Sequence, residues 1–212
     1  MKNNLNYAVE LIRKSDGILI TAGAGMSVDS GLPDFRSSGG FWNAYPAFRE
    51  HNLNFQDIAT PMSFETHTEL IYWFYGHRLV QYRNTTPHEG YQILKRWAAE
   101  KPHGYFVFTS NVDGHFQKAG FEEKRVYEVH GTLERMQCVH DCHHQSWTAK
   151  DFQPEVDNVN LRLTSPYPHC PFCGGLARQN VLMFDDWFYN SNYQDLKRTS
   201  LEQWIKGVAN LV

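Results

Sequence analysis

The sequence predicts an α/β fold: a Rossmann-like, doubly wound parallel sheet with a helical insertion and a small inserted zinc-binding module. Two short apolar runs, residues 17–21 and 105–109, alternate with segments of helical periodicity, which is the pattern of buried parallel strands between covering helices. The first run leads into glycines and then a helical segment, as in nucleotide-binding α/β units. The four cysteines lie in two close pairs, which favours metal binding over disulfides in a reducing compartment.

Periodicity assigns the remaining elements. We expect helices over residues 4–14, 63–82, 88–100 and 190–206, a helix that starts after residue 25, a short helix over 114–119, and further strands over 126–129 and 180–184. Residues 41–64 are aromatic and punctuated by prolines, so we expect a loop or a small helical insertion there. Residues 209–212 resemble the start of an apolar strand, and we therefore expect a sheet that is truncated at its C-terminal side.

These elements fit a single domain over residues 1–212. We expect its Rossmann-like part at about 1–40, 86–135 and 177–212, the helical insertion at 41–85 and the zinc module at 136–176.

Composition narrows the class of protein. Hydrophobic residues make up 42% of the chain and the formal net charge is -3, so a sizeable core is expected but no electrostatic footprint for nucleic acid. No apolar run approaches the roughly 20 residues that span a bilayer. The N-terminus has charges but no apolar core of a signal peptide. We therefore expect a cytoplasmic protein with neither a nucleic-acid nor a membrane partner, and its oligomeric state stays open.

A glycine-rich turn follows the first predicted strand. The segment from Thr21 to Ser27 contains Gly23 and Gly25, which allow a backbone to approach a pyrophosphate closely, and the start of the next helix attracts phosphate. A tight strand-to-helix turn also needs glycine without any ligand. The continuation, which puts Asp34, Phe35 and Arg36 just after the turn, favours the functional interpretation.

Two further polar groups follow predicted strands. Asn111 and Asp113 come at the end of the strand over 105–109, and His130 ends the strand over 126–129 before Gly131. Ligands of open α/β sheets gather at this edge, and an imidazole can accept a proton at neutral pH. An Asx turn and a structural histidine are the alternatives.

The cysteine pairs have the spacings C-x3-C and C-x2-C. Two such knuckles can supply four thiolates to a structural zinc ion. We expect the ligands Cys138, Cys142, Cys170 and Cys173, while the longer first spacing leaves His140, His143 or His144 open as substitutes.

Tyr75 and Arg78 are three residues apart on a predicted helix, so they share one face. An arginine can hold a carboxylate through a two-pronged hydrogen bond. A core tyrosine beside a surface arginine is the alternative.

Taken together, these motifs resemble those of the sirtuins, and the likeness runs from about residue 17 to residue 184. The string GAGMSVDSGLPDFRS is similar to their first signature, TSNVD to their second, and the His-Gly pair and the cysteine pairs follow in the same order. The resemblance implies NAD as co-substrate, one structural zinc ion, an acyl-lysine protein or peptide as partner, and the release of nicotinamide and O-acyl-ADP-ribose.

The resemblance also implies roles for individual residues. His130 would be the catalytic base and Asn111 a second catalytic group near the ribose, while Tyr75 and Arg78 resemble the pair that marks sirtuins preferring succinyl, malonyl or glutaryl lysine. Val181 and Phe184 would contact the acyl peptide. The NAD site would comprise Ala22, Gly23, Ala24, Gly25, Ser27, Asp34, Phe35, Arg36, Ser110, Asn111 and Asp113.

Two departures from the sirtuin pattern leave alternatives open. Ser110 replaces a glutamine, and Phe184-Asp185-Asp186 replaces the usual Phe-Gly-Glu, so an added side chain and charge are expected to narrow or alter the acyl channel. An ADP-ribosyltransferase or an NAD glycohydrolase is therefore the second interpretation of the enzyme. A catalytically silent zinc-containing binding module is the third.

Overall fold

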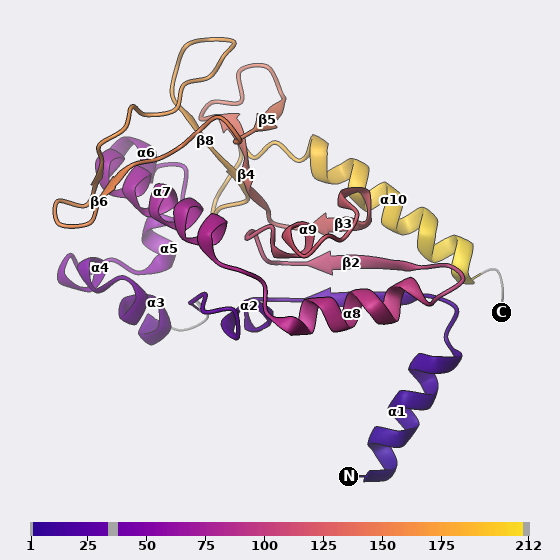
Figure 1. Cartoon of the computed structure of the whole chain (residues 1–212). Coiled ribbons are helices and arrows are strands. Elements are labelled where there is room, and N and C mark those ends of the chain that lie inside the picture. The colour runs from indigo at the N-terminus through magenta and orange to yellow at the C-terminus, as the bar shows by residue number, and fades with distance from the viewer. Residues whose placement is uncertain (1, 34–37, 210–212) are drawn as a thin grey trace.

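The computed structural model describes residues 2–33 and 38–209, and a three-stranded parallel sheet forms its centre (Figure 1). Strands β1 (Ile18–Ala22), β2 (Tyr105–Thr109) and β3 (Val126–Glu128) lie in the order β1-β2-β3. Ala22 pairs with Thr109, which pairs in turn with Glu128. The carboxyl ends of the three strands therefore meet at one edge, as the sequence predicted.

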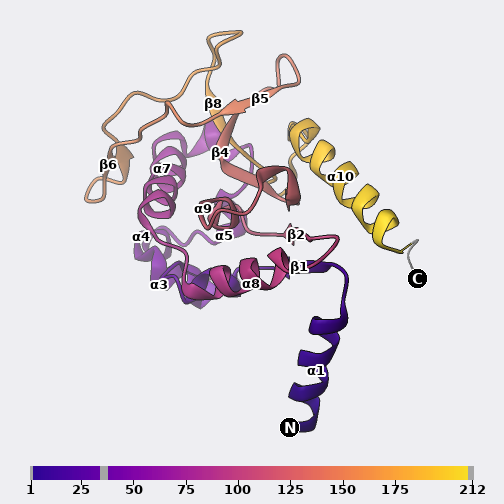
Figure 2. The same ribbon diagram turned by 45° about the vertical axis from the view of Figure 1, so that its right-hand side comes forward.

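Helices cover both faces of this sheet. On one face, α8 (Glu89–Ala99) and α9 (His115–Lys118) pack Tyr91 and Phe116 against Val107. On the other face, α10 (Asn192–Ala209) brings the ring of Trp204 within 6.1 Å of Phe106, centroid to centroid, and Figure 2 shows this helix apart from α8. The sheet is thus doubly wound, and the predicted Rossmann-like α/β class is confirmed.

The first helix, α1 (Lys2–Lys14), projects from the rest of the molecule in Figures 1 and 2. Its predicted apolar stripe forms, but Leu5 and Leu11 are 68% and 53% exposed, so the stripe does not join the core. Among the described residues, no helix combines the length and hydrophobicity that a membrane span requires.

The insertion between β1 and α8 is helical. It contains α3 (Ser38–Ala44), α4 (Pro46–Glu50), α5 (Phe55–Ile58), α6 (Ser63–Thr66) and α7 (Thr68–Asn84). The single helix expected over 63–82 is interrupted at His67, whose φ of -135° and ψ of 40° are not helical. Stacked and edge-on aromatic rings, among them Phe41, Phe48 and Phe74, fill its core.

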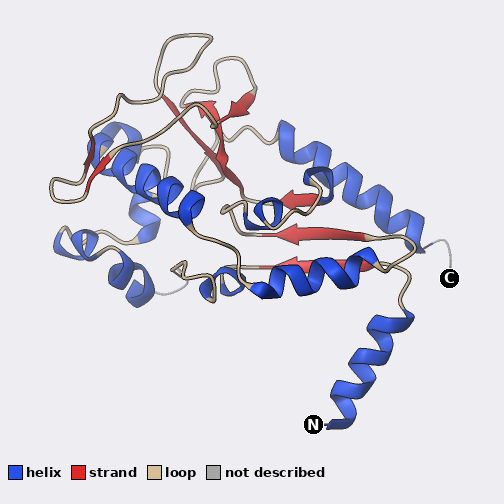
Figure 3. Cartoon of the chain, in the orientation of Figure 1, coloured by secondary structure: helices blue, strands red, loops and turns tan. Residues whose placement is uncertain are grey.

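A second sheet, which is antiparallel, lies apart from the parallel one (Figure 3). Its strands β4 (Gly131–Cys138), β5 (Ser146–Thr148) and β8 (Ala177–Val181) lie in the order β5-β4-β8. A small hairpin of β6 (Val156–Asp157) and β7 (Arg162–Leu163) lies between β5 and β8 in the chain, and the 3-10 helix η1 (Glu123–Arg125) precedes β3.

The position of β8 differs from the expected strand over 180–184. The strand begins three residues earlier, at Ala177, and pairs with β4 instead of extending the parallel sheet. Hydrophobic patterning missed this start because Arg178, Gln179 and Asn180 are polar, yet all three are at most 1% exposed. Asn180 Nδ2 donates to Gln137 Oε1 at 2.7 Å and Arg178 pairs with Asp186, so two of these three buried side chains have polar partners.

Gly131 permits the close approach of β8. Its φ is +77°, and a Cβ atom there would lie 2.1 Å from the carbonyl oxygen of Asn180. Only glycine fits both the left-handed backbone and this contact. The glycine that follows His130 is therefore required by the packing of the two strands.

Candidate active site

A cavity of about 480 Å³ opens at the carboxyl ends of β1 and β2, between the parallel sheet, the helical insertion and the end of β8. This is the edge at which ligands of open α/β sheets bind. It brings together predicted site residues from five separate segments of the chain. Those that line it are Ala24, Ser27, Tyr75, Arg78, Ser110, Asn111, Asp113, His130, Val181 and Phe184.

The glycine turn is tight. The amide of Met26 donates to Gly23 O at 2.9 Å, and that of Ser27 donates to Ala24 O at 3.1 Å. The helix expected after the glycines is present as α2 (Gly25–Val28), which is a single turn. Of this segment Ala24 and Ser27 line the cavity, while Ala22, Gly23 and Gly25 shape the turn behind them.

A hydrogen-bond network ties the glycine turn to the loop after β2. Ser27 Oγ lies 2.5 Å from Asp113 Oδ2, and Asn111 Nδ2 donates to Ser27 Oγ at 3.2 Å. The second carboxylate oxygen of Asp113 accepts from the amide of His115 at 2.9 Å. Ser27 and Asn111 are only 4% and 8% exposed. The polar groups of this wall are therefore held in place before any ligand binds.

His130 lies at the turn between β3 and β4 and is exposed toward the cavity. Its backbone is fixed on both sides, because the amide of Val129 donates to Thr109 O and that of Leu182 donates to His130 O, both at 2.9 Å. An exposed imidazole on a rigid backbone can exchange protons with a ligand in the cavity.

Tyr75 and Arg78 of α7 share one wall of the cavity, as their spacing predicted. Both are buried, at 1% and 5% exposure, so the alternative of a surface arginine is wrong. Arg78 donates to the hydroxyl of Tyr82 from Nη2 at 2.8 Å and from Nε at 3.2 Å. Burial raises the pKa of Tyr75 to about 12, with Arg78 acting in the opposite direction. This wall thus offers a cation and neutral hydroxyl groups among aromatic rings.

The segment after β8 supplies the opposite wall through Val181, Leu182, Met183 and Phe184. Asp185, which stands where sirtuins have glycine, adopts a φ of +54° and is exposed. Asp186 pairs with Arg178 instead of facing the cavity. Neither aspartate is among the residues that line the cavity.

Three predicted cofactor residues, Asp34, Phe35 and Arg36, lie outside the described residues. The residues just before them, Leu32 and Pro33, line the cavity.

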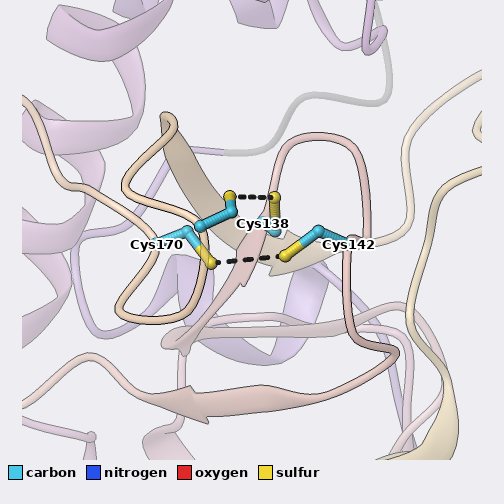
Figure 4. Close-up of side chains that lie close together, drawn as sticks. Cys138, Cys142 and Cys170 are labelled. Carbon is cyan, nitrogen blue, oxygen red and sulfur yellow. Dashed lines mark hydrogen bonds between the residues drawn. The ribbon is translucent and has the colours of Figure 1, made fainter.

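The four cysteines converge at the end of β4, beside the start of β8 (Figure 4). Their sulfur atoms all lie within 4.8 Å of one another, with Cys138 to Cys173 at 3.8 Å and Cys142 to Cys170 at 3.7 Å. A tetrahedral zinc with Zn–S bonds of about 2.3 Å separates its sulfurs by about 3.8 Å, whereas a disulfide needs about 2.05 Å. The geometry fits a structural zinc with four thiolate ligands, and among the described residues no histidine joins this group.

Further residues line the cavity that no sequence motif predicted, among them Phe55, Ala59, Tyr82, Val112, Leu182 and Met183. Tyr82 could have been found, because it lies four residues after Arg78 and hence on the same helix face. Phe55 gave no local signal, since its place in the cavity depends on the packing of α5 against distant elements.

The parallel sheet, the glycine turn at its carboxyl edge and the four-thiol module define a class of nucleotide-binding α/β protein with a structural metal module. The Sir2 family model matches residues 23–203, and the chain belongs to this family. The resemblance to sirtuins is therefore confirmed.

Relatives and solved structures agree with this assignment. An NAD-dependent protein deacylase of Aquifex aeolicus is 32% identical over 169 residues, covering 80% of this chain and 62% of the relative. An NAD-dependent protein deacetylase of Clostridium perfringens is 31% identical over 188 residues, covering 88% and 69%. The structure of a Sir2 homologue in complex with NAD superposes with a TM-score of 0.66 at 26% identity, covering 85% of this chain and 62% of that one. The chain thus spans 62% of the length of the Aquifex relative and of the Sir2 homologue bound to NAD, and 69% of the Clostridium relative.

Proposed function

We propose that this protein is an NAD-dependent protein-lysine deacylase that releases nicotinamide and O-acyl-ADP-ribose. The observation that carries the proposal is the convergence on one cavity of the glycine turn, the Asn111–Asp113 loop, His130 and the Tyr75–Arg78 pair. A dinucleotide and an acyl chain held in one cavity gain the proximity that such a transfer requires.

The cofactor half of the site is proposed at the edge of the parallel sheet. Ala24 and Ser27 would face the phosphates and ribose of NAD. Asn111 and Asp113 would face its nicotinamide half, and Ser110 would lie between these two groups of residues. The prearranged bonds among Ser27, Asn111 and Asp113 support this assignment, because fixed dipoles bind a ligand without reorganising.

His130 is proposed as the general base. Its side chain is exposed at the cavity between the sheet edge and the segment after β8, so it can take a proton from a ribose hydroxyl that then attacks the activated acyl carbon. The acyl carbon would be activated when its oxygen displaces nicotinamide from C1′ of that ribose. One water would then add as the bond between the acyl carbon and the lysine nitrogen breaks, which frees lysine and leaves the acyl group on ADP-ribose.

The acyl group is proposed to enter between α7 and the segment 181–184. Arg78 and Tyr75 line this part of the cavity, and a guanidinium in an apolar wall recognises a carboxylate strongly. We therefore propose succinyl, malonyl or glutaryl lysine as preferred substrates over acetyl lysine. The four free cysteines suit the reducing cytoplasmic setting that we propose.

The test is an assay of acetyl-, succinyl- and glutaryl-lysine peptides with NAD, with products identified by mass spectrometry. We expect O-acyl-ADP-ribose, formed only with an acyl peptide, and a loss of at least about 100-fold in H130A, the usual scale of general-base catalysis. The variant should retain its thermal unfolding temperature. Free ADP-ribose formed without peptide would instead indicate an NAD glycohydrolase, and substantial deacylation by H130A would remove the role of His130.

The proposed preference for acidic acyl groups is tested by the substitution Arg78→Met. R78M should lose activity toward succinyl and glutaryl lysine while acetyl lysine turnover changes little. Equal losses on all three substrates would contradict carboxylate recognition by Arg78.

A further inference from the structure

His88 lies immediately before α8 and caps its first turn with an imidazole. Its Nδ1 accepts a hydrogen bond from the amide of Gly90 at 3.0 Å. N-cap positions are usually occupied by Ser, Thr, Asp or Asn. Capping alone therefore does not explain why this position holds a histidine.

The other ring nitrogen of His88 makes a second contact, to the segment after the glycine turn. His88 Nε2 lies 2.9 Å from the carbonyl oxygen of Met26, in the helical turn that follows the glycines. An amide can only donate and a carbonyl can only accept, so Nδ1 is unprotonated and Nε2 carries the proton. The backbone amide of His88 also donates to Ser30 Oγ at 3.0 Å. One residue thus ties the start of α8 to both ends of residues 26–30.

Tyr91 continues this connection into the cavity wall. Its ring packs edge-on to His88, with centroids 5.0 Å apart, and its hydroxyl lies 3.1 Å from Ser27 Oγ. Burial raises the pKa of Tyr91, so its hydroxyl keeps its proton. The single proton of Ser27 goes to the carboxylate of Asp113, which can only accept, and Ser27 therefore accepts from Tyr91.

Gly90 is explained by the same arrangement. A Cβ atom at this position would lie 2.4 Å from Cε1 and 2.8 Å from Nδ1 of His88. Glycine inside a helix is normally unfavourable relative to alanine, but here it leaves room for the ring. His88, Gly90 and Tyr91 therefore act as one unit behind the glycine turn.

We propose that His88, as the neutral Nε2–H tautomer, is a positioning residue that holds residues 24–30 in the geometry that binds NAD. This inference rests on the proposed NAD-dependent function. The geometry alone carries this assignment, because the bonds from His88 to Met26 and Ser30 and the contact of Tyr91 with Ser27 all end on this segment.

The experiment compares the whole protein with H88N, G90A and the control H51N, which alters an exposed histidine that does not line the cavity. Asparagine preserves an N-cap but is too short to keep the bond to Met26, and G90A displaces the ring while keeping every polar group. NAD affinity is measured by calorimetry, and kcat and KM for NAD, thermal unfolding and amide hydrogen exchange of residues 23–30 are measured alongside.

We expect H88N and G90A to keep the unfolding temperature, to bind NAD roughly three- to tenfold more weakly, the worth of one hydrogen bond, and to raise KM more than they lower kcat. Amide hydrogen exchange over residues 23–30 should become faster in H88N and G90A but not in H51N. Wild-type NAD affinity and wild-type exchange in H88N would overturn this inference alone. A wild type that binds no NAD would overturn the proposed function and this inference with it.

Discussion

Arg178 Nη2 lies 2.8 Å from both carboxylate oxygens of Asp186, and neither side chain is exposed to solvent. The same carboxylate accepts from the amides of Met183 at 3.4 Å and Phe188 at 3.2 Å. The pair therefore shapes the segment that forms one wall of the cavity.

Breaking this pair should be costly. D186A would leave a buried guanidinium uncompensated, and we expect the free energy of unfolding to fall by about 3–5 kcal/mol, measured by urea denaturation. The matched control is E10A, which removes the exposed pair between Glu10 and Lys14 and should cost at most about 0.5 kcal/mol. Similar losses in the two variants would contradict a structural role for the buried pair.

Gly131→Ala tests the contact between β4 and β8. The added methyl would meet the Asn180 carbonyl on a backbone with φ of +77°, so we expect a loss of about 3 kcal/mol or more in unfolding free energy. Gly207→Ala is the control, because nothing lies within 4 Å of its Cβ position on α10, and helix propensity predicts a gain of up to about 1 kcal/mol. A tolerated alanine at 131 would show that β8 can move without cost.

The four-thiol site predicts one zinc per chain by metal analysis of the purified protein. C170S should lose the metal and unfold at a lower temperature, because binding of a structural zinc contributes directly to folding. H143A should keep the metal, because His143 is not one of the four proposed ligands. Its ring nevertheless lies close to the site, with its centroid 3.5 Å from that of Phe172, the residue before Cys173. Zinc that survives C170S, or that is lost in H143A, would contradict the ligand set.

Tyr82→Phe tests how Arg78 is oriented. Loss of the hydroxyl removes two hydrogen bonds from the guanidinium, each about 1.5–3 kcal/mol when a charge is involved. We expect a higher KM for succinyl lysine, with acetyl lysine kinetics nearly unchanged. Equal changes on the two substrates would point to general disturbance of the core.

Glu128 predicts a pH dependence of stability. Its side chain is 2% exposed, and burial raises its pKa from 4.5 to about 8, against the opposing effects of a hydrogen bond from Thr132 and the charge of Lys197. Between these two values the folded protein holds a proton that the unfolded chain does not. Stability should therefore fall as pH rises from about 5 to about 8, by at most about 1.4 kcal/mol per pH unit.

E128Q should abolish this part of the slope. Urea unfolding of the wild type and the variant at several pH values gives the difference, in which contributions from the thiol site cancel. Parallel curves for the two proteins would contradict a raised pKa for Glu128.

The sequence alone determined the strands at the centre of the sheet, the edge at which ligands gather and the four cysteines of the metal module. Strand β2 spans residues 105–109 as predicted, because a short apolar run between glycine and polar residues has no other stable place than a buried strand. The motif residues at its end, Asn111 and Asp113, reach the cavity because strand direction fixes where a strand's end must lie.

Only the tertiary structure decided the pairing of β8 with β4, the place of Tyr82 and Phe55 in the cavity, and the link from His88 to Met26. Each depends on a contact between residues far apart in the chain, where polar side chains are buried by partners that local patterns do not reveal. Local sequence patterns indicate which residues are buried, whereas the tertiary structure determines which residues they contact.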